Sequence, residues 1–307
     1  MASIVFVRRR LVYALLSACL TLLILSWMAR SSTWMSDSHQ LCFLVPFRDR
    51  FDELSEFVPH LSRFLSSQNV PFRMFVLNQI DEFRFNRGAL LNAGFDFVSR
   101  NTDCDYVALH DVDLYPMNPG LDYGHPGTVV RHLAAPGLHP KYDYPNFLGG
   151  IVLIGMSTFR SVNGLTNNFW GWGLEDDDFR ARLQEAGIVI ERPEGLTSGT
   201  TQTFKHHHTQ RRRPRDYRRC YNQRDFTRRR DRNSGLSNLE YELTSHRKMT
   251  VDGFAFDVLS LKLVCDKKLT PFCDCHNAPV EESPIRPVPP EDKIVPQVKP
   301  KRTVKTL

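Results

Sequence analysis

The segment with the densest chemistry lies at residues 169–179 and reads FWGWGLEDDDF, so four acidic residues follow two tryptophans that are spaced by glycine. Adjacent carboxylates repel one another, and a chain that needed only solubility would scatter them. Glycine lets a backbone approach a ligand closely, and tryptophan offers a flat face of the kind that stacks on sugar rings. The segment therefore predicts one wall of a carbohydrate pocket with a general base in it.

The same acids would also suit the start of a helix, because negative charge in the first turn offsets the helix dipole. Phe179, Leu183 and Ala186 then continue an apolar face. The two interpretations are compatible if the acids lie at the mouth of a helix and face a ligand.

A second candidate is Asp111-Val112-Asp113, which follows the apolar run 106–109. In an extended segment Asp111 and Asp113 point the same way while Val112 packs behind them. Two carboxylates suit Mn²⁺ or Mg²⁺, in particular an ion that also holds a diphosphate. The D-x-D pattern alone is common, but its place at a strand end, in a chain with a separate carboxylate pocket, favours a metal site.

His206 and His208 have the same spacing of two residues, which would turn His207 to the other side. Imidazole combined with carboxylate suits Mn²⁺ better than Mg²⁺ or Ca²⁺. The alternative is a surface histidine run beside the arginines that follow it.

The elements that must position these residues alternate along the chain. Apolar runs predict strands at 41–45, 72–77, 106–109, 148–155 and 188–190, and a final pair of strands or one bent strand at 254–264. Helical spacing is found at 54–65 and 88–97, a helix leads from the acidic run to about residue 187, and 121–147 and 197–203 read as loops. This order predicts an α/β fold with a mainly parallel sheet. Ligands of such sheets bind at the carboxyl ends of the strands, where 46–48 and 110–113 lie.

The N-terminal end of the chain predicts a membrane protein. Three arginines precede the apolar run 11–28, which at 1.5 Å per residue would span about 27 Å. We expect a cytoplasmic tail at 1–10, an uncleaved transmembrane signal-anchor at 11–28, a stem at 29–40, a catalytic domain at 41–275 and a Pro-rich disordered tail at 276–307. A cleaved signal peptide, which the site near residue 28 matches poorly, and a buried soluble helix are the alternatives.

The charge is concentrated in one segment. The chain has 307 residues and a net charge of +6, but 211–232 holds eleven arginines against three aspartates, so the rest of the chain carries −2. The basic composition is therefore weak evidence for nucleic acid, and a membrane anchor argues against it; a polyanion-binding protein is the alternative class. If the domain lies beyond a membrane, disulfides are expected. Cys220, Cys265, Cys273 and Cys275 allow three full pairings, which the sequence leaves open.

Taken together, the motifs resemble those of the β-1,4-galactosyltransferases over about residues 41–275. The motifs are PFRDR at 46–50, FNR at 85–87, DVD at 111–113, FWGWG at 169–173, EDD at 175–177 and the final histidines. The H-x-H in place of M-x-x-H, the segment 76–87 and Tyr142-Asp143-Tyr144 are similar to the branch of the family that galactosylates xylose.

The resemblance implies a GT-A nucleotide-sugar transferase fold, UDP-galactose as donor, Mn²⁺ as cofactor and inversion at the anomeric carbon. It also implies a type II protein of the Golgi membrane with a lumenal catalytic domain, whose acceptors are xylosylated core proteins of the proteoglycan linker, or xylosides, and which has no nucleic-acid partner. A β-1,4-galactosyltransferase acting on N-acetylglucosamine is the alternative. A glycoside hydrolase would also use paired carboxylates, but it needs neither a D-x-D nor a histidine pair.

Residue roles follow from the resemblance. It makes Asp176 the catalytic base and Asp113, His206 and His208 the metal ligands. It places at the donor Pro46, Phe47, Arg48, Asp49, Arg50, Phe85, Asn86, Arg87, Asp111, Val112, Tyr142, Trp172 and Glu175. It places at the sugars and the acceptor Tyr142, Tyr144, Trp172, Leu174, Glu175, Asp177 and Arg215. Phe147 stands where a third tyrosine is expected, and His207 where the family often has an apolar residue.

Overall fold

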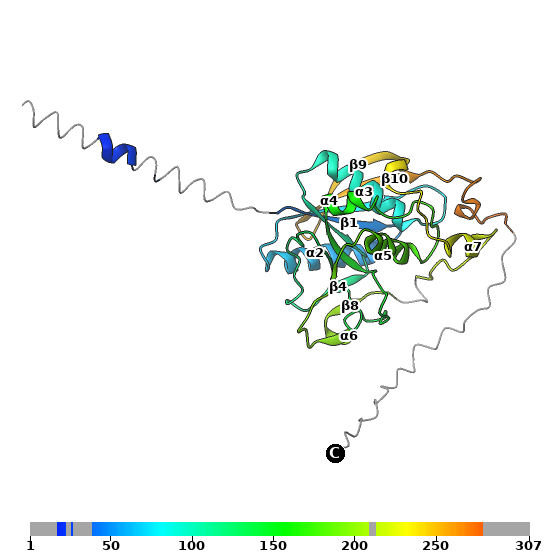
Figure 1. Ribbon diagram of the computed structural model, residues 1–307, viewed down its shortest axis with the longest axis horizontal. Helices are drawn as coiled ribbons and strands as arrows, with labels where there is room; N and C mark the ends of the chain where they lie inside the picture. The colour runs from blue at the N-terminus through cyan, green and yellow to red at the C-terminus, as the bar shows by residue number, and fades with distance from the viewer. Residues whose placement is uncertain (1–16, 23–25, 27–38, 209–212, 279–307) are drawn as a thin grey trace, which may run out of the picture.

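The computed structural model describes residues 17–22, 26, 39–208 and 213–278. Within these residues, eight strands form one sheet in the order β7-β5-β6-β3-β1-β2-β10-β9, and β4 pairs with β8 in a small second sheet (Figure 1). The strands are β1 Leu41–Phe47, β2 Phe72–Gln79, β3 Tyr106–His110, β4 Leu114–Pro116, β5 Val130–His132, β6 Ile151–Gly155, β7 Ile190–Glu191, β8 Phe204–His206, β9 Tyr241–Val251 and β10 Phe254–Leu263. The described α-helices from residue 39 onward are α2 Phe51–Ser66, α3 Arg87–Asn101, α4 Met156–Ser161, α5 Glu175–Glu185, α6 Gly199–Gln202 and α7 Gln223–Thr227. Two short 3-10 helices, η1 Leu236–Asn238 and η2 Pro271–Cys273, complete them.

The large sheet is mixed: the predicted parallel arrangement is confirmed at its centre, but antiparallel pairs flank that centre on both sides. Its centre, β3-β1-β2-β10, is parallel, but β6 runs antiparallel to β3 and to β5, and β9 runs antiparallel to β10. Of the two alternatives predicted for 254–264, the single strand is confirmed: the segment is β10, with a register shift at Ser260 and Leu261. Its partner β9 precedes it across a tight turn. Asp252 and Gly253 in that turn have φ of 50° and 81°, as a two-residue hairpin turn of type I′ requires.

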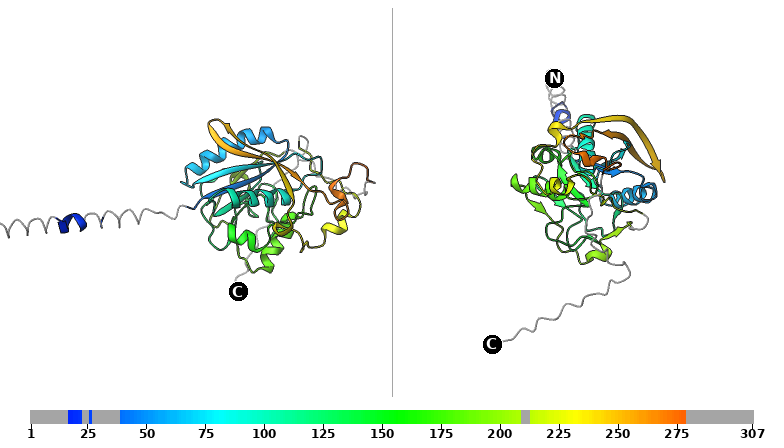
Figure 2. Two further views of the ribbon diagram at one scale, coloured as in Figure 1. Left: turned by 90° about the horizontal axis from the view of Figure 1, so that it is seen from above. Right: turned by 90° about the vertical axis from the view of Figure 1, so that its right-hand side faces the viewer.

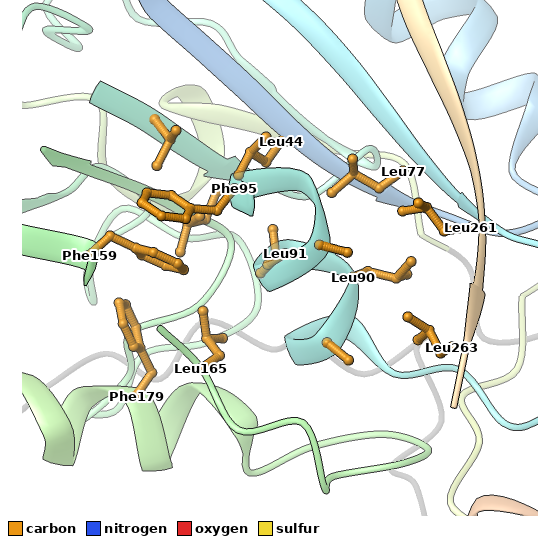
Figure 3. Packing of buried hydrophobic residues seen from close by; sticks show 14 of the residues in the cluster. Leu44, Leu77, Leu90, Leu91, Phe95, Phe159, Leu165, Phe179, Leu261 and Leu263 are labelled. Atoms are coloured by element: carbon orange, nitrogen blue, oxygen red, sulfur yellow. The ribbon is translucent and has the colours of Figure 1, made fainter. Parts of the chain in front are cut away.

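Alternate side chains of β1 enter two separate apolar cores, one on each face of the sheet. Leu41, Phe43 and Val45 pack with α2, whereas Cys42 and Leu44 pack with α3 and, beyond it, Phe179 of α5. Helices therefore cover both faces (Figure 2). Figure 3 shows Leu44 and Leu77 of the strands above Leu90 and Leu91 of α3. The continuous apolar pattern of the central strands follows from burial on both faces.

Three disulfides fasten the fold: Cys42–Cys104, Cys220–Cys275 and Cys265–Cys273. The last two settle which of the three pairings left open by the sequence is present. The first, which joins the start of β1 to the loop before β3, was not expected from the sequence. Among the described cysteines, Cys19 alone is free.

Most of the predicted membrane anchor lies outside the described residues, since only 17–22 and 26 of 11–28 are described. No helix within the described ranges is long and apolar enough to cross a membrane. The predicted cytoplasmic tail, nearly all of the stem and the C-terminal tail beyond residue 278 also lie outside those ranges. These segments remain predictions.

Candidate active site

The candidate metal ligands meet where the small sheet joins the large one. Asp113 follows β3, and β8 pairs with β4 so that His206 lies opposite Leu114. The backbone N–H of His207 donates to the carbonyl of Asp113 at 2.8 Å. As a result, His208 Nδ1 lies 3.3 Å from Asp113 Oδ2 and His206 Nε2 lies 3.8 Å from it. The strand pairing therefore brings Asp113 together with two histidines that follow it by 93 and 95 positions in the sequence.

These three side chains fit a divalent cation. Burial opposes the charge of Asp113, but the hydrogen bond with His208 and the two imidazoles lower its pKa to about 2. Burial lowers the pKa of His206 to about 4, so its imidazole is neutral at pH 7, the form that binds metals. His208 Nε2 is buried and has no hydrogen-bond partner among the described residues. His207 points elsewhere, with its ring 4.5 Å from that of Tyr115.

The acidic run opens helix α5, which confirms the predicted helix start and is compatible with acids that face a ligand. Leu174 precedes the helix with φ of 78°, and the first turn carries Glu175, Asp176 and Asp177. Burial, reinforced by Glu175 and Asp177, raises the pKa of Asp176 to about 7. Burial also raises the pKa values of Glu175 and Asp177. A carboxylate with a pKa near neutrality has the proton affinity that general base catalysis needs.

Arg87 connects this acidic turn to the D-x-D motif. Its Nε donates to Asp111 Oδ1 at 2.9 Å, and its Nη1 lies 3.7 Å from Glu175 Oε1. Burial opposes the charge of Arg87, but Asp111, Glu175 and Asp176 raise its pKa. Burial likewise raises the pKa of Asp111 against the opposite effect of Arg87. One guanidinium thus neutralises carboxylates from both parts of the site.

Gly149 makes room for the candidate base and was missed by the sequence analysis. A Cβ at this position would lie 2.8 Å from Asp176 Oδ2 and 2.7 Å from the ring of Phe147. Only glycine leaves the space that the Asp176 carboxylate occupies here. The available signal was the glycine pair directly before the apolar strand 151–155.

Aromatic side chains form a wall beside the acids. The ring of Phe147 lies 5.0 Å from that of Tyr142 and 5.4 Å from that of Tyr144. The guanidinium of Arg215 lies 5.5 Å from the centre of the Tyr142 ring and 5.0 Å from the Trp172 ring. Trp172 is 47% exposed, while the hydroxyl of Tyr142 is buried without a partner in the described part of the chain. An open aromatic surface beside an unsatisfied hydroxyl suits a sugar ring.

The predicted nucleotide residues lie at the end of β1 and before α3, where several of them have structural partners. Arg48 donates to the carbonyls of Gln79, Asp81 and Phe83 at 2.7–3.2 Å and lies 5.9 Å from the centre of the Phe85 ring. Pro46 and Phe47 belong to β1, Asp49 has φ of 52°, Arg50 Nη1 lies 3.6 Å from Glu53, and Asn86 caps α3 by accepting from the N–H of Ala89. Contact of these residues with a nucleotide remains a prediction.

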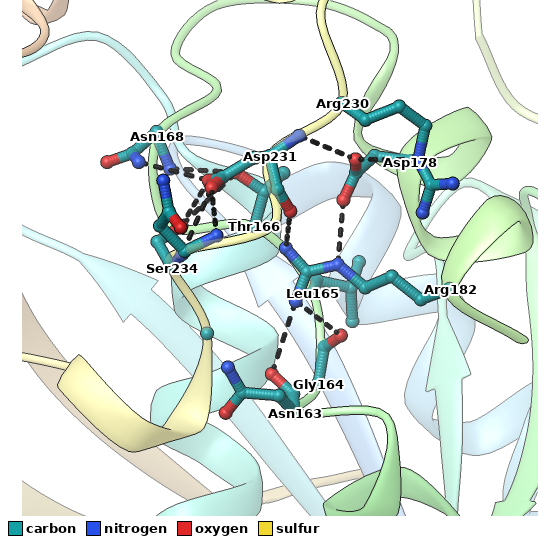
Figure 4. Close-up of polar contacts among 12 residues, drawn as sticks. Asn163, Gly164, Leu165, Thr166, Asn168, Asp178, Arg182, Arg230, Asp231 and Ser234 are labelled. Atoms are coloured by element: carbon teal, nitrogen blue, oxygen red, sulfur yellow. Dashed lines mark hydrogen bonds and ion pairs between the residues drawn. The ribbon is translucent and has the colours of Figure 1, made fainter. Parts of the chain in front are cut away.

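The fourth acid of the run has a different role from its neighbours. Asp178 Oδ2 accepts from Arg182 Nε at 2.8 Å, and Asp178 Oδ1 accepts from the N–H of Asp231 at 3.0 Å. Arg182 Nη2 in turn donates to the carbonyl of Asp231 at 2.7 Å (Figure 4). The Asp231 carboxylate accepts hydrogen bonds from Thr166 and Ser234. This buried network fixes α5 against residues 228–235.

A mixed α/β sheet, a D-x-D after a central strand and acidic and aromatic side chains grouped near it are the arrangement of a glycosyltransferase of the GT-A type. Two family models match the chain: "N-terminal region of glycosyl transferase group 7" at residues 32–124 and "N-terminal domain of galactosyltransferase" at 130–209. The chain is 46% identical to β-1,4-galactosyltransferase 7 of Drosophila melanogaster, over 81% of this chain and 77% of that protein. It belongs to the β-1,4-galactosyltransferase family.

Further members of the same family are also similar to this chain. The chain is 46% identical to human β-1,4-galactosyltransferase 7, over 78% of this chain and 74% of that protein, and 41% identical to xylosylprotein 4-β-galactosyltransferase of Caenorhabditis elegans, over 76% and 82%. The crystal structure of the catalytic domain of the Drosophila enzyme with xylobiose superposes with a TM-score of 0.75 at 47% identity, covering 77% of this chain and 99% of that one. A variant of that enzyme, in complex with manganese, UDP-Gal and xylobiose, matches equally well.

Proposed function

We propose that the protein is a Mn²⁺-dependent inverting galactosyltransferase that moves galactose from UDP-galactose to the 4-hydroxyl of xylose on serine in the proteoglycan linker. The observation that carries the proposal is the placement of Asp176. Its carboxylate, with a pKa near 7, lies against Gly149 and Phe147, next to the aromatic wall. The relatives named as xylosylprotein 4-β-galactosyltransferase, and the solved complex with manganese, UDP-Gal and xylobiose, support the choice of donor, cofactor and acceptor.

Each part of the site then has a role. Asp113, His206 and His208 would hold Mn²⁺, which when bound supplies positive charge for the departing diphosphate. Asp176 takes the proton of the acceptor hydroxyl as its oxygen attacks C1 of galactose from the face opposite UDP, so the configuration inverts. Glu175 and Trp172 orient the donor sugar, Asp177 accepts from ring hydroxyls of the acceptor, and Arg87 keeps the buried carboxylates from repelling one another.

The aromatic wall favours xylose over N-acetylglucosamine. Xylose lacks the hydroxymethyl group and the N-acetyl arm, so a smaller pocket closed by Tyr142, Tyr144 and Trp172 can enclose it. An apolar wall rejects added groups only modestly, whereas a site that hydrogen-bonds hydroxyls strongly rejects analogues that lack them. Phe147 cannot donate the hydrogen bond that a tyrosine would donate, and this change weakens acceptor binding by about 1 kcal/mol.

The test is an assay of the full chain in detergent with UDP-galactose, Mn²⁺ and either a β-xyloside or a β-N-acetylglucosaminide. We expect a higher kcat/KM for the xyloside and loss of turnover when the metal is chelated. Faster transfer to the N-acetylglucosaminide would support the alternative acceptor. Hydrolysis of glycosidic bonds without use of UDP-galactose would contradict the proposal as a whole.

We further propose that the enzyme is a single-pass type II protein of the Golgi membrane with its catalytic domain in the lumen. The apolar run 11–28, the arginines before it and the three disulfides support this orientation. In sealed microsomes, residues beyond 30 should resist added protease until detergent is present. Digestion without detergent would contradict the orientation, and a mature N-terminus near residue 30 would show a cleaved signal peptide instead.

A further inference from the structure

Part of the arginine-rich segment has no partner that accounts for its charge. Within the described residues, the side chains of five arginines contact no carboxylate, and we call them the basic face: Arg218, Arg219, Arg224, Arg228 and Arg229. All are exposed except Arg219, which is half-buried. Asp225 is the one acid among them, also without a partner in the structure as described, so the face carries a net charge of +4.

The other described arginines of the segment are accounted for. Arg213 makes a bidentate pair with Glu53 at 2.9 and 3.1 Å. Arg230 and Arg232 both pair with Glu185, and Arg215 lies on the aromatic wall. The basic face is therefore what remains after structural and pocket roles are assigned.

The basic face begins next to the aromatic wall. The ring of Tyr217 lies 5.0 Å from that of Trp172, and Arg218 is the next residue. Further along, Gln223 Nε2 donates to the carbonyl of Trp170 at 2.7 Å, and Arg224 follows it at the start of α7. Two of the free arginines are thus adjacent in sequence to residues that contact the 169–173 loop.

The backbone that carries these arginines is fixed by a disulfide, an aromatic contact and a hydrogen bond. Cys220 is bonded to Cys275, and the ring of Phe226 packs 5.1 Å from that of Phe272. Arg84 donates to the carbonyl of Arg218 at 2.6 Å. Charges on an anchored backbone are already ordered before a ligand arrives, which lowers the entropic cost of binding.

The reacting sugars offer these arginines nothing to bind. Xylose is uncharged, and the pocket itself presents the acids Glu175, Asp176 and Asp177. The charge of the donor diphosphate is matched by the cation that Asp113, His206 and His208 would hold. Positive charge outside the pocket, on the rim next to Trp172, is therefore available to the part of the acceptor that extends out of the pocket.

We infer that the basic face binds acidic side chains of the acceptor polypeptide near its xylosylated serine. This inference rests on the proposed function. An extended polypeptide spans up to about 3.5 Å per residue, so acids two to four positions from the serine lie about 7–14 Å from it. Exposed charges interact appreciably only within a screening length of roughly 8 Å at physiological salt, so these acids must lie against the basic face itself, which their reach of about 7–14 Å from the serine allows. The enzyme thus selects a neutral sugar by its pocket and an acidic carrier by its rim.

The test compares two xylosylated peptides that differ only in four glutamates replaced by glutamine, together with a simple β-xyloside. For the full chain in detergent we expect kcat/KM to be about tenfold higher for the acidic peptide, since each exposed ion pair contributes a factor of a few. That advantage should fall as salt is added. The double variant Arg218→Gln/Arg224→Gln should reduce it to about twofold and leave turnover of the simple xyloside unchanged.

A matched control removes two positive charges elsewhere. Arg247 and Lys248 are exposed on β9, at the edge of the large sheet, and Arg247→Gln/Lys248→Gln should keep the full preference for the acidic peptide. Equal kcat/KM for the two peptides in the unaltered enzyme would overturn the inference. So would a double variant at 218 and 224 that raises KM for UDP-galactose, because the face would then serve the donor.

A third result would also overturn the inference. If the double variant keeps the peptide preference but loses binding to phosphatidylserine vesicles, the face serves a membrane surface instead. Failure of the unaltered enzyme to galactosylate even the simple xyloside is a different outcome, because it contradicts the proposed function on which the inference rests.

Discussion

Asp176 and Asp178 belong to one acidic run, but the first is a candidate catalytic base and the second is part of a structural ion pair. Asp176 has its pKa raised to about 7 by burial and by its acidic neighbours, whereas Asp178 is bound to Arg182. We expect Asp176→Asn to lower kcat by about 10²–10⁴-fold, the usual contribution of a general base, with little change in donor affinity. Steady-state kinetics with varied UDP-galactose would measure both. An equal loss for Asp178→Asn with unchanged stability would move the base along the run.

The raised pKa of Asp176 also predicts the pH dependence of turnover. A general base acts when deprotonated, so kcat should be nearly full above pH 8 and should decline tenfold per pH unit well below 7. A residue with an ordinary carboxylate pKa would keep its activity down to about pH 5. Turnover measured at constant Mn²⁺ from pH 5 to 9 checks this, and a flat profile through pH 6 would count against Asp176 as the base.

Gly149 offers a test of geometry without a change in charge. Alanine there would place Cβ 2.8 Å from Asp176 Oδ2, so we expect the carboxylate to be displaced and kcat to fall more than tenfold. Gly155 is the matched control, because its Cβ would meet nothing nearer than 3.5 Å. If Gly149→Ala and Gly155→Ala have equal activity, the close packing around Asp176 is not needed for catalysis.

Among the elements, α5 depends on a buried ion pair for its position. Removing one partner of such a pair leaves an uncompensated charge and costs about 3–5 kcal/mol. We therefore expect Arg182→Ala to lower the free energy of unfolding by about the lower end of that range, because Asp178 would remain buried with only the N–H of Asp231 and, at 3.7 Å, the guanidinium of Arg230 beside it. Arg180→Ala on the same helix loses an exposed hydrogen bond to Gln184 and a solvent-screened attraction to Asp177 and should change stability by less than about 0.5 kcal/mol. Denaturant unfolding of both variants distinguishes these outcomes.

The elements that the sequence predicted correctly are those with strong apolar patterns. β1, β2, β3, α2, α3 and α5 were found because each of them buries a continuous run or one face. β9 was missed because it is an exposed edge strand without regular apolar alternation, and β4, β5 and β8 have three residues each. The edge strand and the short strands form through pairing with partners distant in sequence, and local periodicity does not encode that pairing.

At the site, residue types and motif spacing predicted an acidic cluster beside tryptophans and a meeting of Asp113 with His206 and His208, and the structure brings these side chains together. The roles of base and metal ligands remain predictions. Residue types and spacing did not separate Asp178 from the acids before it, because the difference depends on Arg182 and Asp231. Nor did they find Gly149, whose importance lies in the space it leaves for a side chain 27 positions away. Arg48 and Asn86 were predicted at the nucleotide, but the hydrogen bonds that hold neighbouring loops and the start of α3 become visible only in three dimensions.

For the whole molecule, the C-terminal third is attached to the domain by the pairing of β10 with β2 and by core packing, and a disulfide joins two distant parts of that third to each other. Cys220 and Cys275 close a loop with a sequence separation of 55, and the chain-entropy relation gives about 4 kcal/mol for such a loop. We expect Cys220→Ala/Cys275→Ala to lower the free energy of unfolding by roughly this amount in non-reducing guanidinium titrations. Cys19→Ser is the control, because Cys19 forms no disulfide. An unchanged midpoint would show that packing alone holds the segment.

The bridging position of Arg87 has a consequence for how the two substrates communicate. Arg87 and Asp111 come from the first half of the chain, and Glu175 and Asp176 come from the second. Arg87 is the counter-ion that all three acids share. Groups coupled in this way titrate as a set, so a change in the charge of one carboxylate changes the pKa values of the other two. A nucleotide that alters the charge near Asp111 would therefore change the proton affinity of Asp176. Donor binding and base strength are then thermodynamically linked, and the linkage is reciprocal.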